Sequence, residues 1–374
     1  MSVANVKRNT VSFDDSFVRE VIRFGGSDLK VCMQCSECTV VCPLSPDSNP
    51  FPRKEMIWSQ WGLKDRLLRD PDIWMCQECG ECSKECPRNA KPGSVMTALR
   101  TVTISYYSWP QFLGKAFREK WFLPVFSLVP IALFILVYYL FHLSIPSSGP
   151  VYFSSFIPFN LVDASGIVIG IFAVFSLGYG SWRYYKSISA EKKGEKKFIP
   201  AAISALKIVL FHTRFSKCAS NHNRYYSHLL VFYGFIVLLI ATFVGALEIH
   251  VFGFQHLLLW EPQNIIGDIG FITIFPGIMI ALVNRAVSKV PKEETYFDWY
   301  FLALLALIVL TGFAMEILRA MNNGSAYYVY VSHLILVFML IAYAPYSKFA
   351  HVFYRFFAMV YLESIGRVPS REIA

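Results

Sequence analysis

The sequence predicts an all-α membrane protein with two parts, a small helical head and a bundle of six transmembrane helices. Hydrophobic residues make up 55% of the 374 residues and charged residues only 16%, and the mean hydropathy is +0.44. Such values are typical of integral membrane proteins and exclude an ordinary soluble domain. Residues 1–115 are mixed and charged, whereas residues 116–374 alternate apolar runs with basic segments. We therefore expect a domain boundary near residue 115.

The head is expected to contain short helices joined by loops. Phe17, Val21 and Phe24 recur at helical spacing, which predicts a helix over residues 14–24. One or two further helices are expected within residues 50–74, and another over residues 93–104. So small a domain buries little apolar surface, and bound metal would contribute to its stability.

Two cysteine-rich segments of the head share one pattern. Eight of the nine cysteines fall in "CMQCSECTVVCP" (residues 32–43) and "CQECGECSKECP" (residues 76–87), and each segment reads C-x2-C-x2-C-x3-C-P. Three closely spaced thiolates can hold three corners of a four-iron cubane, and in two-cluster ferredoxins the fourth cysteine ligates the other cluster. The pattern therefore predicts two [4Fe–4S] clusters, one held by Cys32, Cys35, Cys38 and Cys86 and one by Cys76, Cys79, Cys82 and Cys42.

Structural zinc is the alternative for these cysteines, because zinc is also commonly held by four thiolates. Zinc sites usually consist of paired C-x2-C motifs without a third in-line cysteine and a trailing proline, so iron–sulfur clusters are favoured. The first 26 residues lack the apolar core of a secretory signal, and we expect a cytosolic head with reduced thiols. In the basic loop, Cys218 is expected to be a free thiol, and His212 and His222 to be solvated or hydrogen-bonded.

Six apolar runs after the head are long enough to cross a bilayer. They cover about 121–143, 165–185, 227–249, 263–285, 299–319 and 328–349. Lysine and arginine collect in loops 186–226 and 286–298, whereas loops 144–164, 250–262 and 320–327 contain neither. The positive-inside rule therefore predicts that the head and both termini are cytoplasmic, at the inner membrane of a bacterium or archaeon. Because the net charge of +9 gathers beside these spans, nucleic-acid binding is not expected.

Four histidines near the two membrane surfaces suggest haem ligation. On the third span, His228 lies at the cytoplasmic start and His250 at the outer end; on the sixth, His333 lies near the outer end and His351 at the cytoplasmic end. The last two are 18 residues apart, which on one continuous helix returns to the same face. Two such helices suit two b haems, an inner one between His228 and His351 and an outer one between His333 and His250.

The outer haem site leaves alternatives open. His142 and His256 lie on the same side of the membrane and compete with His250 as ligands. Imidazoles at these depths can also serve as interfacial anchors. His250 lies 22 residues after His228, which is longer than the facing spacing and requires a tilted or bent helix.

Three carboxylates near the outer surface are candidate proton acceptors for a quinol. Glu248, Asp268 and Glu316 lie close to the outer ends of their spans, where charge is costly and often serves proton transfer. Each could instead be an interfacial carboxylate that contacts water. Glu316 could also pair with Arg319, three residues further along the same helix.

The motifs resemble a known combination of proteins. The head, with its two cysteine segments and "CPRNAKPGSVMTALR" closing the second, resembles the C subunit of heterodisulfide reductase. The membrane part resembles the cytochrome b subunit of heterodisulfide reductase and the gamma subunit of respiratory nitrate reductase. Their fusion in one chain resembles the QmoC family, the membrane components of the quinone-interacting membrane-bound oxidoreductases (Qmo) of sulfate reducers. This resemblance covers nearly the whole chain.

The resemblance implies a two-cluster ferredoxin head on a cytochrome b bundle. In the gamma-subunit pattern the last helix carries two histidines 18 residues apart, which His333 and His351 match, and His228 matches the cytoplasmic ligand of the other helix. The position of the fourth ligand is Leu238 here. This departure leaves the outer haem without that ligand or moves the ligand to His250.

The resemblance also implies partners and a direction for electrons. Menaquinol is the implied donor, QmoA-like and QmoB-like flavin/iron–sulfur subunits are the implied partners, and adenylylsulfate reductase is the implied acceptor. The chain is then an oxidoreductase subunit that passes electrons through haem b and two [4Fe–4S] clusters. The alternatives are the anchor of a heterodisulfide-reductase-like complex with a thiol or disulfide substrate, and a zinc-headed membrane anchor or transporter.

Overall fold

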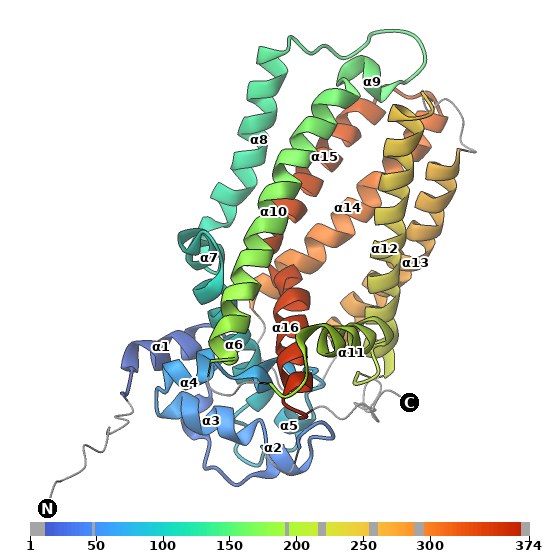
Figure 1. Cartoon of the computed structure of the whole chain (residues 1–374). Helices are drawn as coiled ribbons and strands as arrows, with labels where there is room; N and C mark the ends of the chain where they lie inside the picture. Colours follow the sequence, from blue (N-terminus) through green and yellow to red (C-terminus); the bar gives the residue numbers. More distant parts are fainter. Residues whose placement is uncertain are drawn as a thin grey trace, which may run out of the picture.

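The computed structural model describes residues 12–46, 49–190, 194–215, 222–253, 261–287 and 295–367. Within these ranges the regular structure is entirely helical, with no strand. Six helical segments are long and apolar enough to cross a membrane. The predicted all-α class with a six-helix membrane bundle is therefore confirmed. Figure 1 shows the head at one end of the bundle, with the long helices extending away from it.

The head consists of six short helices and two 3-10 turns. The helices are α1 (Asp15–Arg23), α2 (Glu37–Val40), α3 (Arg53–Gln60), α4 (Lys64–Leu68), α5 (Glu81–Lys84) and α6 (Pro92–Tyr107), and the turns are η1 (Leu29–Val31) and η2 (Pro71–Trp74). α1 is the first predicted helix. Asp14 caps it by accepting the Phe17 N–H at 3.0 Å, and Phe17 and Val21 are buried on one face, as their spacing predicts.

The spans occur in the predicted order and differ from the predicted bounds by a few residues at most ends. They are Lys120–Leu140, Phe159–Ile188, His222–His250, Pro262–Val287, Asp298–Ala320 and Ala326–Tyr346. The corresponding helices are α8 (Leu123–Leu140), α10 (Phe159–Ile188), α12 (His222–His250), α13 (Pro262–Val287), α14 (Tyr296–Ala320) and α15 (Ala326–Tyr343). The other helices are α7 (Gln111–Phe117), α9 (Phe153–Phe156), α11 (Phe198–Phe211) and α16 (His351–Ser364).

The last predicted helix is broken, and this corrects the expectation that His333 and His351 share one helix. α15 ends at Tyr343, 3-10 turns cover 344–346 and 348–350, and α16 begins at His351. Pro345 provides the physical reason, because proline lacks the N–H that continues a helix and disfavours helical backbone in the residue before it. The face relation based on 18 helical residues therefore does not hold.

α12 and α13 pack closely because small residues face each other. A Cβ added at Gly234 would come within 2.8 Å of the Ile274 backbone nitrogen, and one added at Gly277 within 3.0 Å of the Ser227 carbonyl oxygen. The Ser227 hydroxyl donates a hydrogen bond to the Gly277 carbonyl at 2.8 Å. This contact fixes the start of α12, where His228 lies.

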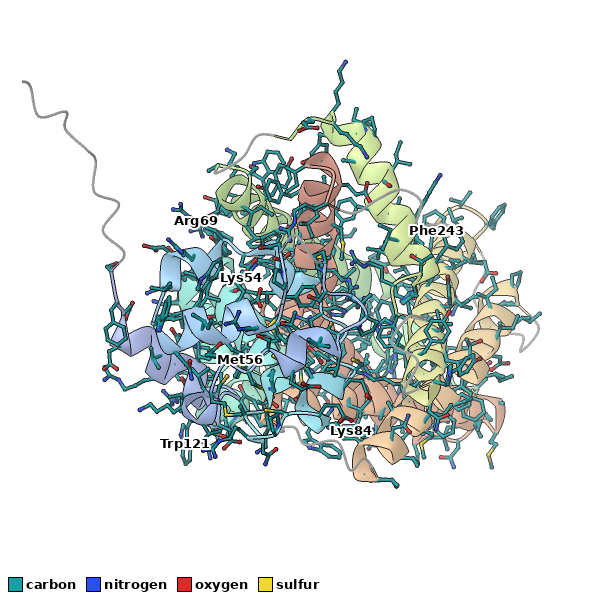
Figure 2. The ribbon with its side chains drawn as sticks, turned by 90° about the horizontal axis from the view of Figure 1, so that it is seen from below. Lys54, Met56, Arg69, Lys84, Trp121 and Phe243 are labelled. Carbon is teal, nitrogen blue, oxygen red and sulfur yellow. The ribbon has the colours of Figure 1, made fainter. Side chains whose placement is uncertain are left out.

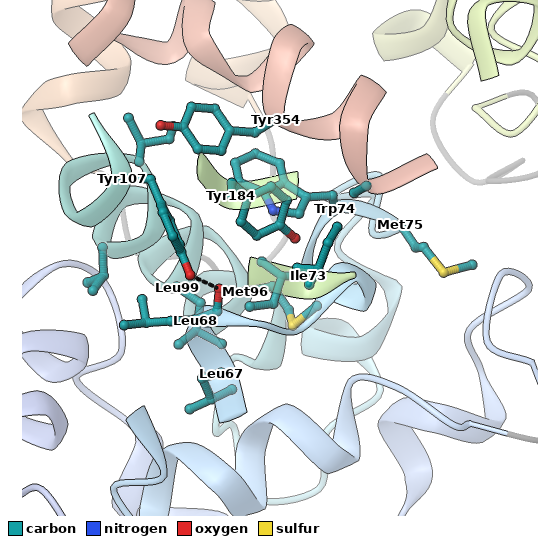
Figure 3. Packing of buried hydrophobic residues seen from close by; sticks show 14 of the residues in the cluster. Leu67, Leu68, Ile73, Trp74, Met75, Met96, Leu99, Tyr107, Tyr184 and Tyr354 are labelled. Atoms are coloured by element: carbon teal, nitrogen blue, oxygen red, sulfur yellow. Dashed lines mark hydrogen bonds between the residues drawn. The ribbon is translucent and has the colours of Figure 1, made fainter. Parts of the chain in front are cut away.

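The head shares its hydrophobic core with helices of the membrane part. Trp74 of η2 stacks on Tyr354 of α16 with ring centroids 5.5 Å apart, and Tyr184 of α10 packs edge-on to Trp74 at 6.1 Å (Figure 3). Tyr107 donates a hydrogen bond to the Leu68 carbonyl at 3.2 Å. Ala201 of α11 is buried in the same cluster. The two parts therefore do not have separate hydrophobic cores.

Figure 2 looks onto the head along the bundle and shows Lys54, Met56 and Lys84 over part of the bundle's end, while Phe243 of α12 lies to one side. α16 and α11 pack together near the head, as Figure 1 also shows. The head thus lies against α10, α11 and α16, and the C-terminal residue that the structure describes contacts it as well. Arg367 donates to Asp72 Oδ1 at 2.8 Å.

Candidate metal centres

The cysteines of the head line two pockets, and each pocket combines both sequence segments. The first pocket is lined by Cys32, Cys35, Cys38 and Cys86. The second is lined by Cys42, Cys76, Cys79 and Cys82. The structure therefore brings together the two sets of four that the spacing predicts, and their ligation of clusters remains a prediction. Cys218 lies outside the described residues.

The two segments bend in the same way to turn their cysteines inward. Gln34 and Ser36 have φ of 63° and 74°, and Glu78 and Gly80 have φ of 54° and 92°. Left-handed backbone at alternate residues lets a short chain curl around one centre, at a cost for residues other than glycine. α2 and α5 then begin directly after these bends and pack on each other. Their contact lets the fourth cysteine of each segment reach the opposite pocket.

The cysteine side chains are protonated in the absence of metal and fit a cationic cluster. Burial raises the pKa of the Cys38 thiol to about 12 and that of Cys42 to about 11. Iron binds the thiolate, so loading would displace these protons. The Glu78 N–H donates to Cys76 Sγ and the Ala90 N–H to Cys86 Sγ, both at 3.3 Å. Such hydrogen bonds to sulfur tune the reduction potential of iron–sulfur clusters.

The second pocket is attached to the membrane helices by polar contacts. Glu78 accepts from Arg100 at 2.6 Å and from Arg224 of α12 at 3.4 Å. Gln77 Oε1 accepts from Arg355 of α16 at 2.9 Å. Burial raises the pKa of Glu78, but Arg100 and the other nearby cations outweigh burial and hold that pKa well below its usual range. Glu78 is therefore an anion between the pocket and the bundle.

The inner histidines have the hydrogen bonds that a haem ligand needs. His351 Nδ1 bonds to the Lys348 carbonyl, which leaves Nε2 free for a metal. Burial lowers the pKa of His351 to about 4, so the ring is neutral. His228 Nδ1 is buried and has no hydrogen-bond partner among the described residues. A ligating imidazole is neutral and usually donates its other N–H to a carbonyl, so these residues fit an inner haem.

His212 was expected in solvent, and the structure shows that this expectation was wrong. Its side chain is buried, with the residue only 9% exposed, and its ring centroid lies 4.9 Å from that of His228. Its Nδ1 bonds to the Leu210 carbonyl at 3.0 Å, and burial lowers its pKa. The reason is that residues 198–211 form a helix that packs on α16 and carries His212 inward. The apolar run before His212 was the signal that could have found it.

The outer histidines contact other side chains. His250 Nε2 lies 2.6 Å from Asp163 Oδ2 of α10, so the nitrogen needed for a metal is engaged by a carboxylate. His333 Nδ1 bonds to Thr311 Oγ1 at 3.0 Å, and its ring packs on Gly312. No contact among the described residues joins His250 to His333. The pair therefore does not fit an outer haem as it stands. His142 is exposed in the loop after α8, and His256 lies outside the described residues.

The outer carboxylates form two groups. Glu316 of α14 lies within hydrogen-bonding reach of Asp268 of α13 and near Arg319. Glu248 is buried at the end of α12, where its Oε1 accepts the Gln263 N–H at 3.2 Å. The structure thus brings Asp268 and Glu316 together and places Glu248 at the start of α13.

The comparisons with known proteins divide at the same point as the fold. The family "4Fe-4S dicluster domain" matches residues 28–90, which supports two [4Fe–4S] clusters over structural zinc. A protein of Archaeoglobus profundus that is like the C subunit of heterodisulfide reductase is 38% identical over 93 residues, which cover 24% of this chain and 50% of that protein. The chain thus spans half the length of this relative. No solved structure matches the chain.

The membrane part matches a second group. "Citrate utilization protein B" of Escherichia coli is 24% identical over 280 residues, which cover 70% of this chain and 71% of that protein. The E subunit of the dihydromethanophenazine:CoB--CoM heterodisulfide reductase of Methanosarcina acetivorans is 28% identical over 163 residues, 38% of this chain and 60% of that protein. The family described as "Citrate utilization protein B" matches residues 120–370, more than half of the chain. The six apolar helices and these matches make the chain a membrane protein that belongs to the Citrate utilization protein B family.

Proposed function

We propose that this chain is the membrane electron-transfer subunit of an oxidoreductase complex, with residues 1–115 as its cytoplasmic iron–sulfur domain and residues 116–374 as its membrane domain. The observation that carries the proposal is the contact between the second pocket and the helices of the inner histidines. Gln77 and Glu78, which lie between Cys76 and Cys79, touch Arg355 and Arg224, each four residues from His351 or His228. Redox centres held by both parts would therefore be neighbours.

His228 and His351 are the proposed ligands of one inner haem b, which would supply one-electron chemistry between a quinol and the head. The structure joins His250 to Asp163, so we propose no step through an outer haem. Menaquinol is the proposed membrane substrate. Because a quinol that loses two electrons also loses two protons, Asp268 and Glu316 together are better placed as proton acceptors than Glu248 alone.

The proposed partners are flavin-containing subunits like those of the Qmo complexes, with adenylylsulfate reductase as the final acceptor. The supporting relatives are heterodisulfide reductase subunits in which only part of the length is shared. A second candidate is electron transfer during citrate utilization, favoured by the match to the E. coli protein over 70% of this chain. Growth of a deletion strain on sulfate or on citrate distinguishes the two, because only one of these growth modes should be lost.

The cofactor content of the purified protein tests the proposal. Two four-iron clusters predict roughly eight cluster irons per chain together with one haem b, seen as a sharp reduced α-band above broad iron–sulfur absorbance. A colourless protein that contains zinc would contradict it.

Substitution of the inner histidines tests the ligand assignment. His351→Ala or His228→Ala should remove the haem and leave the iron–sulfur content unchanged, because the cysteine pockets do not use these rings. His222→Ala is the matched control, since His222 is exposed at the start of the same helix α12. Retention of full haem content and an unchanged haem potential in both variants would show the assignment to be wrong.

A further inference from the structure

The two cysteine loops occupy equivalent places in their segments but have different surroundings. Gln77 and Glu78 in the second loop correspond by position to Met33 and Gln34 in the first. Met33 is 58% exposed and Cys35 is exposed. Gln34 contacts only head residues in the described hydrogen bonds, through Gln60 at 2.7 Å and through Arg53, which donates to its carbonyl at 3.3 Å. The first loop therefore faces outward.

The second loop is bound to both helices that carry the inner histidines. Gln77 accepts from Arg355 at 2.9 Å, and Arg355 lies four residues after His351 on α16. Glu78 accepts from Arg224 at 3.4 Å, and Arg224 lies four residues before His228 on α12. Four residues make about one helical turn, so each contact lies next to a candidate haem ligand.

Arg100 holds this loop from the side of the head. Its guanidinium donates to Glu78 Oε1 at 2.6 Å, to the Ile73 carbonyl at 2.9 Å and to the Cys76 carbonyl. Glu78 is thus bonded to arginines from both parts of the molecule. Charge-assisted hydrogen bonds of this kind are stronger and more directional than neutral ones, so they fix the separation between the loop and the bundle.

We infer that the two clusters of this chain act in a fixed order, with Gln77 and Glu78 as positioning residues for the first transfer. The second pocket (Cys42, Cys76, Cys79 and Cys82) exchanges electrons with the inner histidine site, and the first pocket (Cys32, Cys35, Cys38 and Cys86) exchanges electrons with the partner protein. Each transfer oxidises one centre by one electron and reduces the next by one, without proton or bond exchange. The inference rests on the proposed function, since it orders the sites of that same route.

The rate of electron passage in the purified, fully loaded protein tests this order. Electron tunnelling slows steeply with distance, and Glu78→Gln removes the charge that holds the loop to Arg224 while it keeps the side-chain shape. With haem and cluster contents unchanged, mixing with a soluble menaquinol analogue should show cluster reduction slowed at least about tenfold relative to haem reduction. Glu81→Gln is the matched control, because Glu81 lines the same pocket but has no described contact with α12 or α16. It should change this rate less than twofold.

Electron paramagnetic resonance identifies which cluster is affected. Loss of the Glu78 anion should raise the reduction potential of one cluster, and a water-soluble dysprosium chelate should enhance the spin relaxation of the other cluster more strongly, because the first pocket is the exposed one. An unchanged rate in Glu78→Gln, or strong chelate relaxation of the cluster whose potential shifts, would overturn the order. If the protein holds both clusters but no haem, the proposed haem route fails, while the chelate experiment still decides which cluster faces outward.

Discussion

At the scale of single residues, the head contains a buried ion network next to the junction with the bundle. Lys54 Nζ lies 3.2 Å from Glu55 and 3.2 Å from Asp70 and also contacts Asp72. All three carboxylates are buried. Burial and then the charge of Asp70 raise the pKa of Glu55, and burial and then the charge of Asp72 raise that of Asp70. The lysine therefore compensates charges that water cannot reach.

Removal of this lysine should destabilise the head strongly. Lys54→Met leaves buried carboxylates without their cation, which costs about 3–5 kcal/mol of stability. Both raised carboxyl pKa values mean that the ionised forms oppose folding above the unfolded pKa and that protonation relieves this opposition. The loss should therefore be larger at pH 8 than at pH 5.5, measured as the temperature at which iron–sulfur absorbance disappears.

The control for this prediction is another lysine of the head. Lys64 pairs with Asp14 at 3.4 Å, and both side chains are about one-third exposed. Lys64→Met should cost less than about 1 kcal/mol, because solvent screens such a pair. Equal losses in the two variants would show that the buried network does not stabilise the head.

At the scale of elements, the contact between α12 and α13 holds the start of the helix that carries His228. Gly277→Ala places a methyl group 2.8 Å from Leu230 Cβ, so α12 must shift near His228. Overpacking of this kind costs about 1–3 kcal/mol. We expect a lower haem content per chain and a lower temperature of haem loss in this variant, both measured by optical spectroscopy.

Gly267 offers a matched control on the same helix α13. A Cβ added there meets no atom within 4 Å. Gly267→Ala should keep the wild-type haem content, and alanine's higher helix propensity should make it at least as stable. Loss of haem in both variants would point to a general effect of substitution in α13 and not to the contact with α12.

The sequence predicted these elements where the deciding signals are local. The cysteine spacing predicts two sets of four because the ligands of a cluster come from short turns, and the apolar runs reveal six spans because the bilayer fixes their length. Pro345 was also a local signal, but it lies inside a long apolar run and the break it causes was missed. His212 could not be placed from its own loop, since its burial depends on where α11 packs against α16.

At the scale of the whole molecule, the head and the bundle are less separate than the composition suggests. Tyr184 and Ile188 of α10, Ala205 of α11 and Leu362 of α16 are buried in the same cluster as the head residue Trp74. A boundary near residue 115 marks a change in composition, but the hydrophobic core crosses it. Composition reports only what each segment contains, and it does not report which surfaces the segments bury against each other.

Separation of the head from the bundle should therefore weaken its hold on the clusters. A fragment of residues 1–115 exposes the faces of Trp74, Tyr107 and Leu99 that α10 and α16 cover in the full chain. Each large apolar side chain that returns to water costs about 1.5–3 kcal/mol. After anaerobic reconstitution, the fragment should lose iron–sulfur absorbance at a lower temperature than the full chain in the same detergent. A fragment that retains both clusters as long as the full chain would show that the head is an independent domain and that the shared core contributes little.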